Sequence, residues 1–239
     1  MIKAITFDLW NTLLEDKHFN APRLQATAEA LHNHGTPRSP EEVKEAYRSA
    51  ARAYRREWEE DHRHMTVDRR IRHMLQGLHV KPEEELIQEM IGRFEGCFLE
   101  DPPTLKEGVE ETLNALNGRY RLGIISDTGV TPGTLIREHL NQRGLLHHFA
   151  STVFSDETGH CKPHPTQFRK ALQELDAEPH EAIHVGDLIR TDIAGAQAIG
   201  MKAVWVQTEG KTAPDHTQPD YTVTNLNQIL TLPEILGKL

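Results

Sequence analysis

The sequence predicts an α/β fold: a Rossmann-like, doubly wound, mostly parallel sheet core with an inserted four-helix cap domain. Beyond residue 101 short apolar runs alternate with helical segments, which is typical of a parallel sheet covered by helices on both faces. Residues 15–100 show helical patterns alone. A carboxylate, Asp8, directly follows the first apolar run, and open α/β sheets bind ligands at the carboxyl ends of their strands.

The first expected strand ends at Phe7, and helices should follow it without an intervening strand. Apolar residues at helical spacing place them over 21–35 and 40–60, from about residue 66, and after residue 83. Ser39 precedes a proline and two glutamates, which is typical of a helix N-cap followed by proline and acidic residues in the first turn. Such a run predicts a small helical bundle inserted after the first strand.

Two prolines after Asp101 end the helical run, and strands then alternate with helices. Strands are expected over 120–126, 152–155, 182–185 and 203–206, with helices over 134–142, 165–175 and 191–199. We therefore expect residues 1–14 and 101–239 to form the core domain and residues 15–100 to form the cap domain.

Composition limits the class of protein and its partners. The 239 residues carry a formal net charge of −9, which argues against nucleic acid or an anionic membrane surface as a partner. No segment reaches the roughly 18 apolar residues of a membrane span. Cys97 and Cys161 allow a single bridge and no export signal precedes the first strand, so we expect a reducing, cytoplasmic location. Monomer and homodimer both stay open.

Four short motifs carry chemically useful side chains at the ends of predicted strands. In chain order they are Asp8–Thr12, Ser126 with Asp127, Lys162 before a proline, and Gly186–Asp192. Asp8 and Asp187 would reach the same edge of the sheet, and carboxylates are ligands that Mg²⁺ prefers. A phosphate dianion approaching Asp8 would be repelled unless cations offset the charge, and Lys162 supplies one.

The order and spacing of these motifs resemble the haloacid dehalogenase-like hydrolases, with an insertion where the family's type-one helical cap belongs. The resemblance implies a magnesium-dependent phosphatase whose substrate is a small molecule: a phosphate ester or an acyl or aryl phosphate. Asp8 would be the nucleophile, forming an aspartyl-phosphate that water hydrolyses. Lys162 would neutralise charge and keep Asp8 ionised.

Further site residues follow from the same resemblance. Mg²⁺ would be held by Asp8, Asp187 and the main-chain carbonyl of Trp10, while Asp192 would orient bound water or Lys162, or bind the metal directly. The remaining candidates contact the phosphoryl group or the substrate: Ser126, Thr12, Asn11, Asp127 and Lys162.

Trp10 departs from the pattern of the family's phosphatases, which carry a second aspartate there as general acid and base. General acid–base catalysis contributes about 10²–10⁴-fold, so an enzyme without it should be slow on alkyl phosphates. Aryl and acyl phosphates, whose leaving groups need less protonation, would remain substrates. Trp10 would either pack under the cap or shape the substrate pocket.

Trp10 also supports an alternative, because the 2-haloacid dehalogenases resemble this sequence in carrying an aromatic residue, tyrosine, at that position. Those enzymes use no metal and have a Ser-x-Asn pattern in place of Gly186-Asp187, which is intact here. A halide would need a cationic side chain, for which Arg52, Arg55 and Arg56 are the candidates.

Two further alternatives remain open. Phosphonate-cleaving relatives also lack the second aspartate and use a cap lysine, for which Lys44 and Lys81 are the candidates here. A degenerate member of the family could instead bind magnesium or phosphate without turnover. In the cap, Tyr47, Tyr54 and Trp58 lie at roughly helical spacing; core packing is the favoured interpretation over a place in the pocket.

Overall fold

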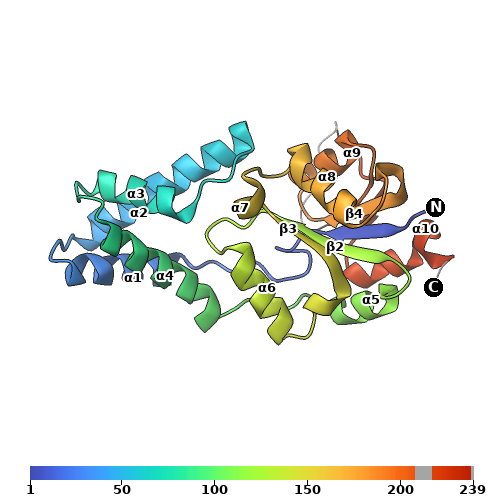
Figure 1. Cartoon of the computed structure of the whole chain (residues 1–239), viewed down its shortest axis with the longest axis horizontal. Coiled ribbons are helices and arrows are strands. Elements are labelled where there is room, and N and C mark those ends of the chain that lie inside the picture. Colours follow the sequence, from blue (N-terminus) through green and yellow to red (C-terminus); the bar gives the residue numbers. More distant parts are fainter. Residues whose placement is uncertain (208–216, 238–239) are drawn as a thin grey trace.

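The computed structural model describes residues 1–207 and 217–237, and this part of the chain forms a six-stranded sheet (Figure 1). The strands lie in the order β3-β2-β1-β4-β5-β6, and every neighbouring pair is parallel. Their bounds are β1 Ala4–Phe7, β2 Arg121–Ser126, β3 Phe149–Phe154, β4 Ala182–Gly186, β5 Lys202–Val206 and β6 Tyr221–Val223. The predicted doubly wound α/β class is confirmed.

The strand order reverses at β1, and this position places the site. In a sheet of this kind ligands bind outside the carboxyl ends of the strands on either side of the reversal. Phe7, the last residue of β1, is in register with Ile124 of β2 and Val185 of β4. The residues that follow these strands therefore meet at one edge of the sheet.

Helices cover both faces of the sheet and bury separate apolar clusters. On one face α5 (Val109–Leu116) and α6 (Gly133–Gln142) pack against alternate residues of the central strands. On the other face α8 (Pro165–Glu174) and α9 (Ala194–Ala198) do the same. All residues of β1 and β4 are buried, as expected for central strands of a parallel sheet.

The cap consists of helices between β1 and β2, gathered at one end of the molecule while the N-terminus lies at the other (Figure 1). They are α1 Asn20–Asn33, α2 Pro40–Arg56, α3 Val67–Gly77 and α4 Glu84–Glu100. These helices share an apolar cluster of their own. At the start of α2 the predicted N-cap is present: Glu42 N donates to Ser39 Oγ at 3.3 Å, and Ser39 N donates to Glu42 Oε2 at 2.9 Å.

Main-chain hydrogen bonds join the cap to the core beyond the two linkers. The end of α2 widens into a π-helical segment, Glu57–Asp61, and the chain then pairs with the core loop before Lys162. His64 N donates to the carbonyl of Gly159 at 3.1 Å, and Cys161 N donates to the carbonyl of His62 at 2.8 Å. This pairing holds the end of α2 beside the edge of the sheet that carries Asp8.

The sequence-based element predictions are wrong in several details. α5 and β6 were not predicted, although α5 has apolar residues at helical spacing, and β6 has three residues, too few for a recognisable pattern. The helix expected over 191–199 begins earlier as a π-helical turn, Ile189–Ile193. The predicted division at residues 14/15 and 100/101 stays a prediction, and its core range includes 208–216 and 238–239, outside the described residues. Across the described ranges no helix combines the length and the apolarity needed to cross a bilayer.

Candidate active site

Asp8 lies at the carboxyl end of the central strand and is 5% exposed. Its N–H donates to the carbonyl of Val185 at 2.8 Å, which continues the pairing of β1 with β4. The chain then turns sharply, with Leu13 N and Leu14 N both donating to the carbonyl of Leu9 at 2.8 Å. Within the turn Asn11 has φ of 58°, a left-handed conformation that asparagine tolerates better than most residues.

Lys162 joins two carboxylates in the buried floor of the site. Its Nζ lies 2.5 Å from Asp8 Oδ1 and 2.7 Å from Asp192 Oδ1, and it donates to the carbonyl of Ile125 at 2.9 Å. Burial by itself would lower the pKa of this amine, but the carboxylates of Asp192 and Asp8 outweigh it and raise the pKa above its usual value. The lysine is therefore a permanent cation beside Asp8.

Asp192 is held in place from several directions. Its Oδ2 accepts from Leu188 N at 2.9 Å, and its Oδ1 faces His184 Nε2 at 3.4 Å. Burial would raise the pKa of this carboxyl, but the charge of Lys162 dominates and lowers it, so Asp192 is ionised. Gly186 makes this placement possible, because a Cβ at that residue would lie 2.4 Å from Asp192 Cγ. The glycine that begins the Gly186–Asp192 motif thus has a steric role.

Asp8, Asp187 and Asp192 form an acidic cluster in which one carboxylate oxygen from each lies within 4.8 Å of the others. All three side chains are buried. Burial raises the pKa of Asp8 well above its usual value; Lys162 acts against this, while Asp192 and Asp187 raise it further. One lysine does not balance three carboxylates, so a divalent cation with hard oxygen ligands fits this set of donors.

Two buried hydroxyl groups near Asp8 have no hydrogen-bond partner in the described part of the chain. Ser126 ends β2, Thr12 follows Asp8 in the first turn, and their side-chain oxygens have no hydrogen-bond partner among the described residues. Leaving a buried hydroxyl unpaired costs about 1–3 kcal/mol, which favours a ligand that accepts from these groups. Neither residue is among those that line the pocket described below.

The Asp127 side chain forms hydrogen bonds with residues of both the core and the cap. Its Oδ1 accepts from Lys162 N at 3.1 Å and Gln167 Nε2 at 2.7 Å, and its Oδ2 accepts from Trp58 Nε1 at 2.9 Å. Burial raises the pKa of the Asp127 carboxyl, while the charge of Lys162 and the three donors act against this rise. Trp10 Nε1 donates to the main-chain carbonyl of the same residue at 3.1 Å.

These residues line a cavity of about 500 Å³ between core and cap. Of the residues singled out from the sequence, it is lined by Asp8, Trp10, Asn11, Tyr54, Trp58, Asp127, Lys162, Asp187 and Asp192. Trp10 both lines this cavity and packs under the cap, where its ring lies edge-on against Phe98 of α4 with ring centroids 6.4 Å apart. The expectation of core packing holds for Tyr47, which contacts the cap cluster, and is wrong for Tyr54 and Trp58.

Several lining residues were missed, and several candidates lie elsewhere. Asp16 and His18, in the linker before α1, line the cavity but follow no recognisable motif. The halide candidates are exposed and do not line it: Arg52, Arg55 and Arg56. Lys44 and Lys81, the candidates for phosphonate chemistry, are also exposed and outside it.

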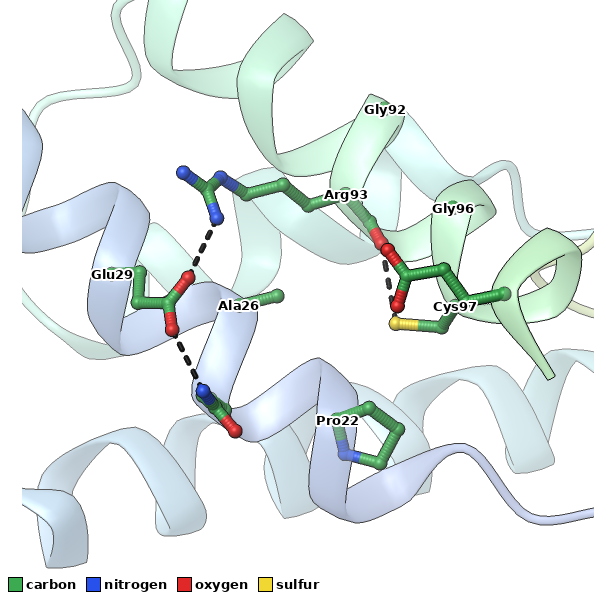
Figure 2. Close-up of a pocket in the computed structure, with 9 residues that line it drawn as sticks. Pro22, Ala26, Glu29, Gly92, Arg93, Gly96 and Cys97 are labelled. Atoms are coloured by element: carbon green, nitrogen blue, oxygen red, sulfur yellow. Dashed lines mark hydrogen bonds and ion pairs between the residues drawn. The ribbon is translucent and has the colours of Figure 1, made fainter.

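A second cavity, of about 370 Å³, lies in the cap between α1 and α4 (Figure 2). Its charged groups are paired with one another: Arg93 Nη1 lies 2.7 Å from Glu29 Oε2. Cys97 Sγ donates to the carbonyl of Arg93 at 3.2 Å. None of its lining residues belongs to the cavity around Asp8.

The parallel sheet, its reversal at β1 and the charged groups gathered there define a doubly wound α/β protein with a charged cavity at the carboxyl edge of its sheet. A family model described as haloacid dehalogenase-like hydrolase matches residues 2–200. The chain therefore belongs to the haloacid dehalogenase-like hydrolases, and the resemblance found in the motifs is confirmed.

Curated relatives are phosphatases by name. A 134-residue segment is 38% identical to glyceraldehyde 3-phosphate phosphatase of Pyrococcus furiosus, covering 53% of each chain. A 95-residue segment is 39% identical to phosphoserine phosphatase of Thermus thermophilus, covering 40% of this chain and 38% of the relative. The matched segments thus span about half or less of these relatives.

Solved structures share the fold over nearly the whole chain. A 2-haloacid dehalogenase from Pseudomonas syringae pv. Tomato superposes with a TM-score of 0.73 and 28% identity, covering 99% of both chains. A phosphatase of the same family from Thermococcus onnurineus has a TM-score of 0.67 and 24% identity, also over 99% of both chains. The second likeness concerns the fold alone.

Proposed function

We propose that this protein is a magnesium-dependent phosphatase that hydrolyses a small phosphorylated metabolite through an aspartyl-phosphate at Asp8. The observation that carries the proposal is the buried group formed by Lys162, Asp8 and Asp192 beside Asp187. The names of the curated relatives support phosphate monoesters as substrates. A cytoplasmic location and a monomeric or dimeric state are part of the same proposal.

Asp8, Asp187 and the Trp10 carbonyl would hold Mg²⁺, and Asp192 would orient its water or Lys162. When bound, the ion supplies positive charge that offsets the repulsion between the substrate phosphate and the carboxylates. Its fit rests on the excess of buried carboxylate over buried cation at this edge of the sheet.

Asp8 attacks phosphorus in line with the leaving oxygen, so that a bond from the carboxylate to phosphorus forms as the ester bond breaks. Lys162 favours the ionised form of Asp8 against the burial that raises its pKa, a bound divalent cation would favour that form further, and Lys162 balances charge as it develops. The unpaired hydroxyls of Ser126 and Thr12 donate to the phosphoryl oxygens. Water then hydrolyses the acyl phosphate, releasing inorganic phosphate and restoring the carboxylate.

The leaving group decides how fast the first step runs. The Trp10 indole N–H donates to the carbonyl of Asp127, and both oxygens of the Asp127 carboxyl accept from N–H groups of the protein. Neither residue therefore directs a proton at the leaving oxygen. Aryl and acyl phosphates, whose leaving oxygens are weak bases, should therefore react faster than alkyl phosphates.

Hydrolysis of p-nitrophenyl phosphate tests the proposal directly. We expect turnover with Mg²⁺, its loss in EDTA, and a fall of at least about 10³-fold in Asp8→Asn. Asp176→Asn is the matched control, because Asp176 is exposed and lies away from the cavity. Turnover that survives both EDTA and Asp8→Asn would disprove the proposal.

The 28% identical dehalogenase structure and the aromatic Trp10 favour a second candidate, displacement of halide from a 2-haloacid by Asp8. The buried Asp187 argues against it, since a metal-free reaction has no use for a third carboxylate beside the nucleophile. Chloride release from 2-chloropropionate in EDTA, with no phosphatase activity, would reverse the ranking.

A further inference from the structure

One of the arginines of α3 has no acidic partner. Arg69 forms a bidentate ion pair with Glu57, with Nη1 2.9 Å from Oε2 and Nη2 2.8 Å from Oε1. Arg72 pairs with both Asp68 and Glu84. Arg70, between them, lies within 4.0 Å of no carboxylate of the described residues. Its Nε and Nη2 atoms are nevertheless buried and have no hydrogen-bond partner there.

A second buried arginine lies in the same part of the cap. Arg23 of α1 is 8% exposed, and its guanidinium stacks on Phe19, 5.1 Å from the ring centroid. It too forms no ion pair with a described residue, whereas Arg93 of α4 pairs with Glu29 (Figure 2) and also with Glu89. Burial lowers the pKa of Arg70, and the charge of Arg23 contributes to the lowering, which indicates that the two cations are close.

Both arginines line a cavity of about 310 Å³ that adjoins the cavity around Asp8. The two cavities share lining residues: Trp10, Asp16, His18, Tyr54 and Asp127. The Arg70 guanidinium lies 3.4 Å from the centroid of the Tyr54 ring, and this ring lines both cavities. Arg70 therefore lies on the cap side of the cavity around Asp8, in contact with a ring that lines both cavities.

The cavity around Arg70 is lined by other charged groups as well. Lys17 pairs with Asp101, and Asp127 accepts its three donors. Asp16 is exposed, and its Oδ2 lies 3.7 Å from His18 Nε2. Asp16 and Asp127 line this cavity as well, but neither Arg70 nor Arg23 forms an ion pair with a carboxylate of the described residues.

Burying an unpaired cation is costly, and proteins pair buried charges or leave them for a ligand. The free donors of Arg70 are Nε and Nη2, which share one edge of the planar group. That edge matches the two oxygens of a carboxylate or a phosphate in a bidentate pair.

We propose that Arg70, supported by Arg23, binds a second anionic group, a carboxylate or phosphate, on the leaving part of the substrate. The inference rests on the proposed phosphatase function and narrows its substrate class to small phosphate monoesters with an acidic leaving group. A monoester with an uncharged leaving group would leave the Arg70 edge unpaired.

Binding to the Asp8→Asn chain with Mg²⁺ present tests this without depending on turnover. We compare 3-phosphoglycerate with glycerol 3-phosphate by calorimetry, because the two differ only in a carboxylate against a hydroxymethyl group. The carboxylate compound should bind about 10- to 100-fold more tightly. The same affinity ratio is measured for propane-1,3-diol bisphosphate and its monophosphate, which differ in a phosphate against a hydroxyl. Comparing the two ratios shows whether the site prefers a phosphate or a carboxylate.

Substitutions at Arg70 assign the preference. Arg70→Gln in the same background should reduce the preference to less than about 3-fold, and Arg70→Lys, which keeps the charge and loses the planar edge, should reduce it in part. Arg72→Gln, on the same helix and outside the cavity, should leave it unchanged. Since Arg70→Gln removes an unpaired buried charge, its melting temperature should not fall.

Lack of preference in the Asp8→Asn chain, or a preference that survives Arg70→Gln, would overturn the subsite. The phosphatase function fails separately if the wild-type chain with Mg²⁺ does not hydrolyse p-nitrophenyl phosphate. A preference for the anionic ligands that depends on Arg70 supports the subsite in either case.

Discussion

The two sides of the active-site cavity are built in different ways. On the core side Lys162 joins Asp8 to Asp192, and Leu188 N donates to the other carboxylate oxygen of Asp192. On the cap side the Arg70 guanidinium stacks on the Tyr54 ring, and its Nε and Nη2 have no hydrogen-bond partner among the described residues. In the proposed function the core side is prepared for chemistry before substrate arrives, whereas the donors of Arg70 on the cap side would be paired by the substrate.

The difference teaches where reaction and selectivity lie. The core groups project from strand ends whose positions follow from the sheet, so they suit a reaction common to many substrates. The cap groups come from helices held by their own apolar cluster and by the pairing of residues 62–64 with residues 159–161. Changes in the cap can alter the substrate while leaving the core charges in place.

The largest effect is expected from Lys162→Met. Removing the cation leaves Asp8 and Asp192 facing each other while buried, which should cost about 3–5 kcal/mol of folding free energy. Activity of the folded fraction should drop roughly 10³-fold. Urea denaturation and p-nitrophenyl phosphate kinetics measure the two effects. Lys170→Met in α8, where the side chain is 43% exposed, is the matched control and should show neither.

A pair of glycine substitutions compares the core with the cap. In Gly186→Ala the new Cβ would meet Asp192 Cγ at 2.4 Å, so we expect a loss of about 1–3 kcal/mol in stability, together with reduced activity. In Gly92→Ala the new methyl has nothing within 4 Å in α4, so stability should stay or rise by up to about 1 kcal/mol. Equal thermal shifts for both variants would contradict the steric role of Gly186.

The junction of cap and core should be sensitive to acid through His64. Its Nδ1 lies 3.0 Å from Ser155 Oγ across the junction, and burial lowers its pKa to about 4. The unfolded chain protonates His64 below about pH 6.5, whereas the folded chain does so only near pH 4. The free energy of unfolding therefore decreases as the pH is lowered from 6.5 to 4. We expect a loss of about 2 kcal/mol between pH 7 and 4.5.

Urea midpoints measured across this pH range for wild type and His64→Gln check the expectation. The variant should lose less stability on acidification than the wild type. His32→Gln, at an exposed position of α1, should follow the wild type. Parallel curves for all three chains would remove His64 from the junction's acid response.

The smallest expected effect concerns Trp10. Trp10→Asp should raise turnover of an alkyl phosphate such as glycerol 3-phosphate by about 10-fold, because a carboxyl beside Asp8 can protonate the leaving oxygen. Trp10→Asn, which removes the same indole without adding an acid, is the control and should not gain. An equal gain in both variants would show that relief of crowding, and not acid catalysis, is responsible.

Local sequence was enough for the core side of the site. The apolar runs before Asp8, Ser126 and Asp187 each predict a buried strand, and parallel strands in register deliver the following residues to one edge. Helix starts at Ser39 and Thr66 were also predictable, since their side chains accept from main-chain N–H groups three residues ahead. The three-residue β6 was not, because its strand conformation depends on pairing with β5.

The sequence by itself determined the doubly wound sheet, the helical insertion after β1 and the residues that end the strands, because apolar periodicity and strand-end chemistry are written in neighbouring residues. Only the tertiary structure decided which cap residues enter the cavity. Tyr54 and Trp58 face Asp127 while Arg52, Arg55 and Arg56 of the same segment face solvent. The isolation of Arg70 from carboxylates likewise depends on how separate helices pack, which no local pattern records.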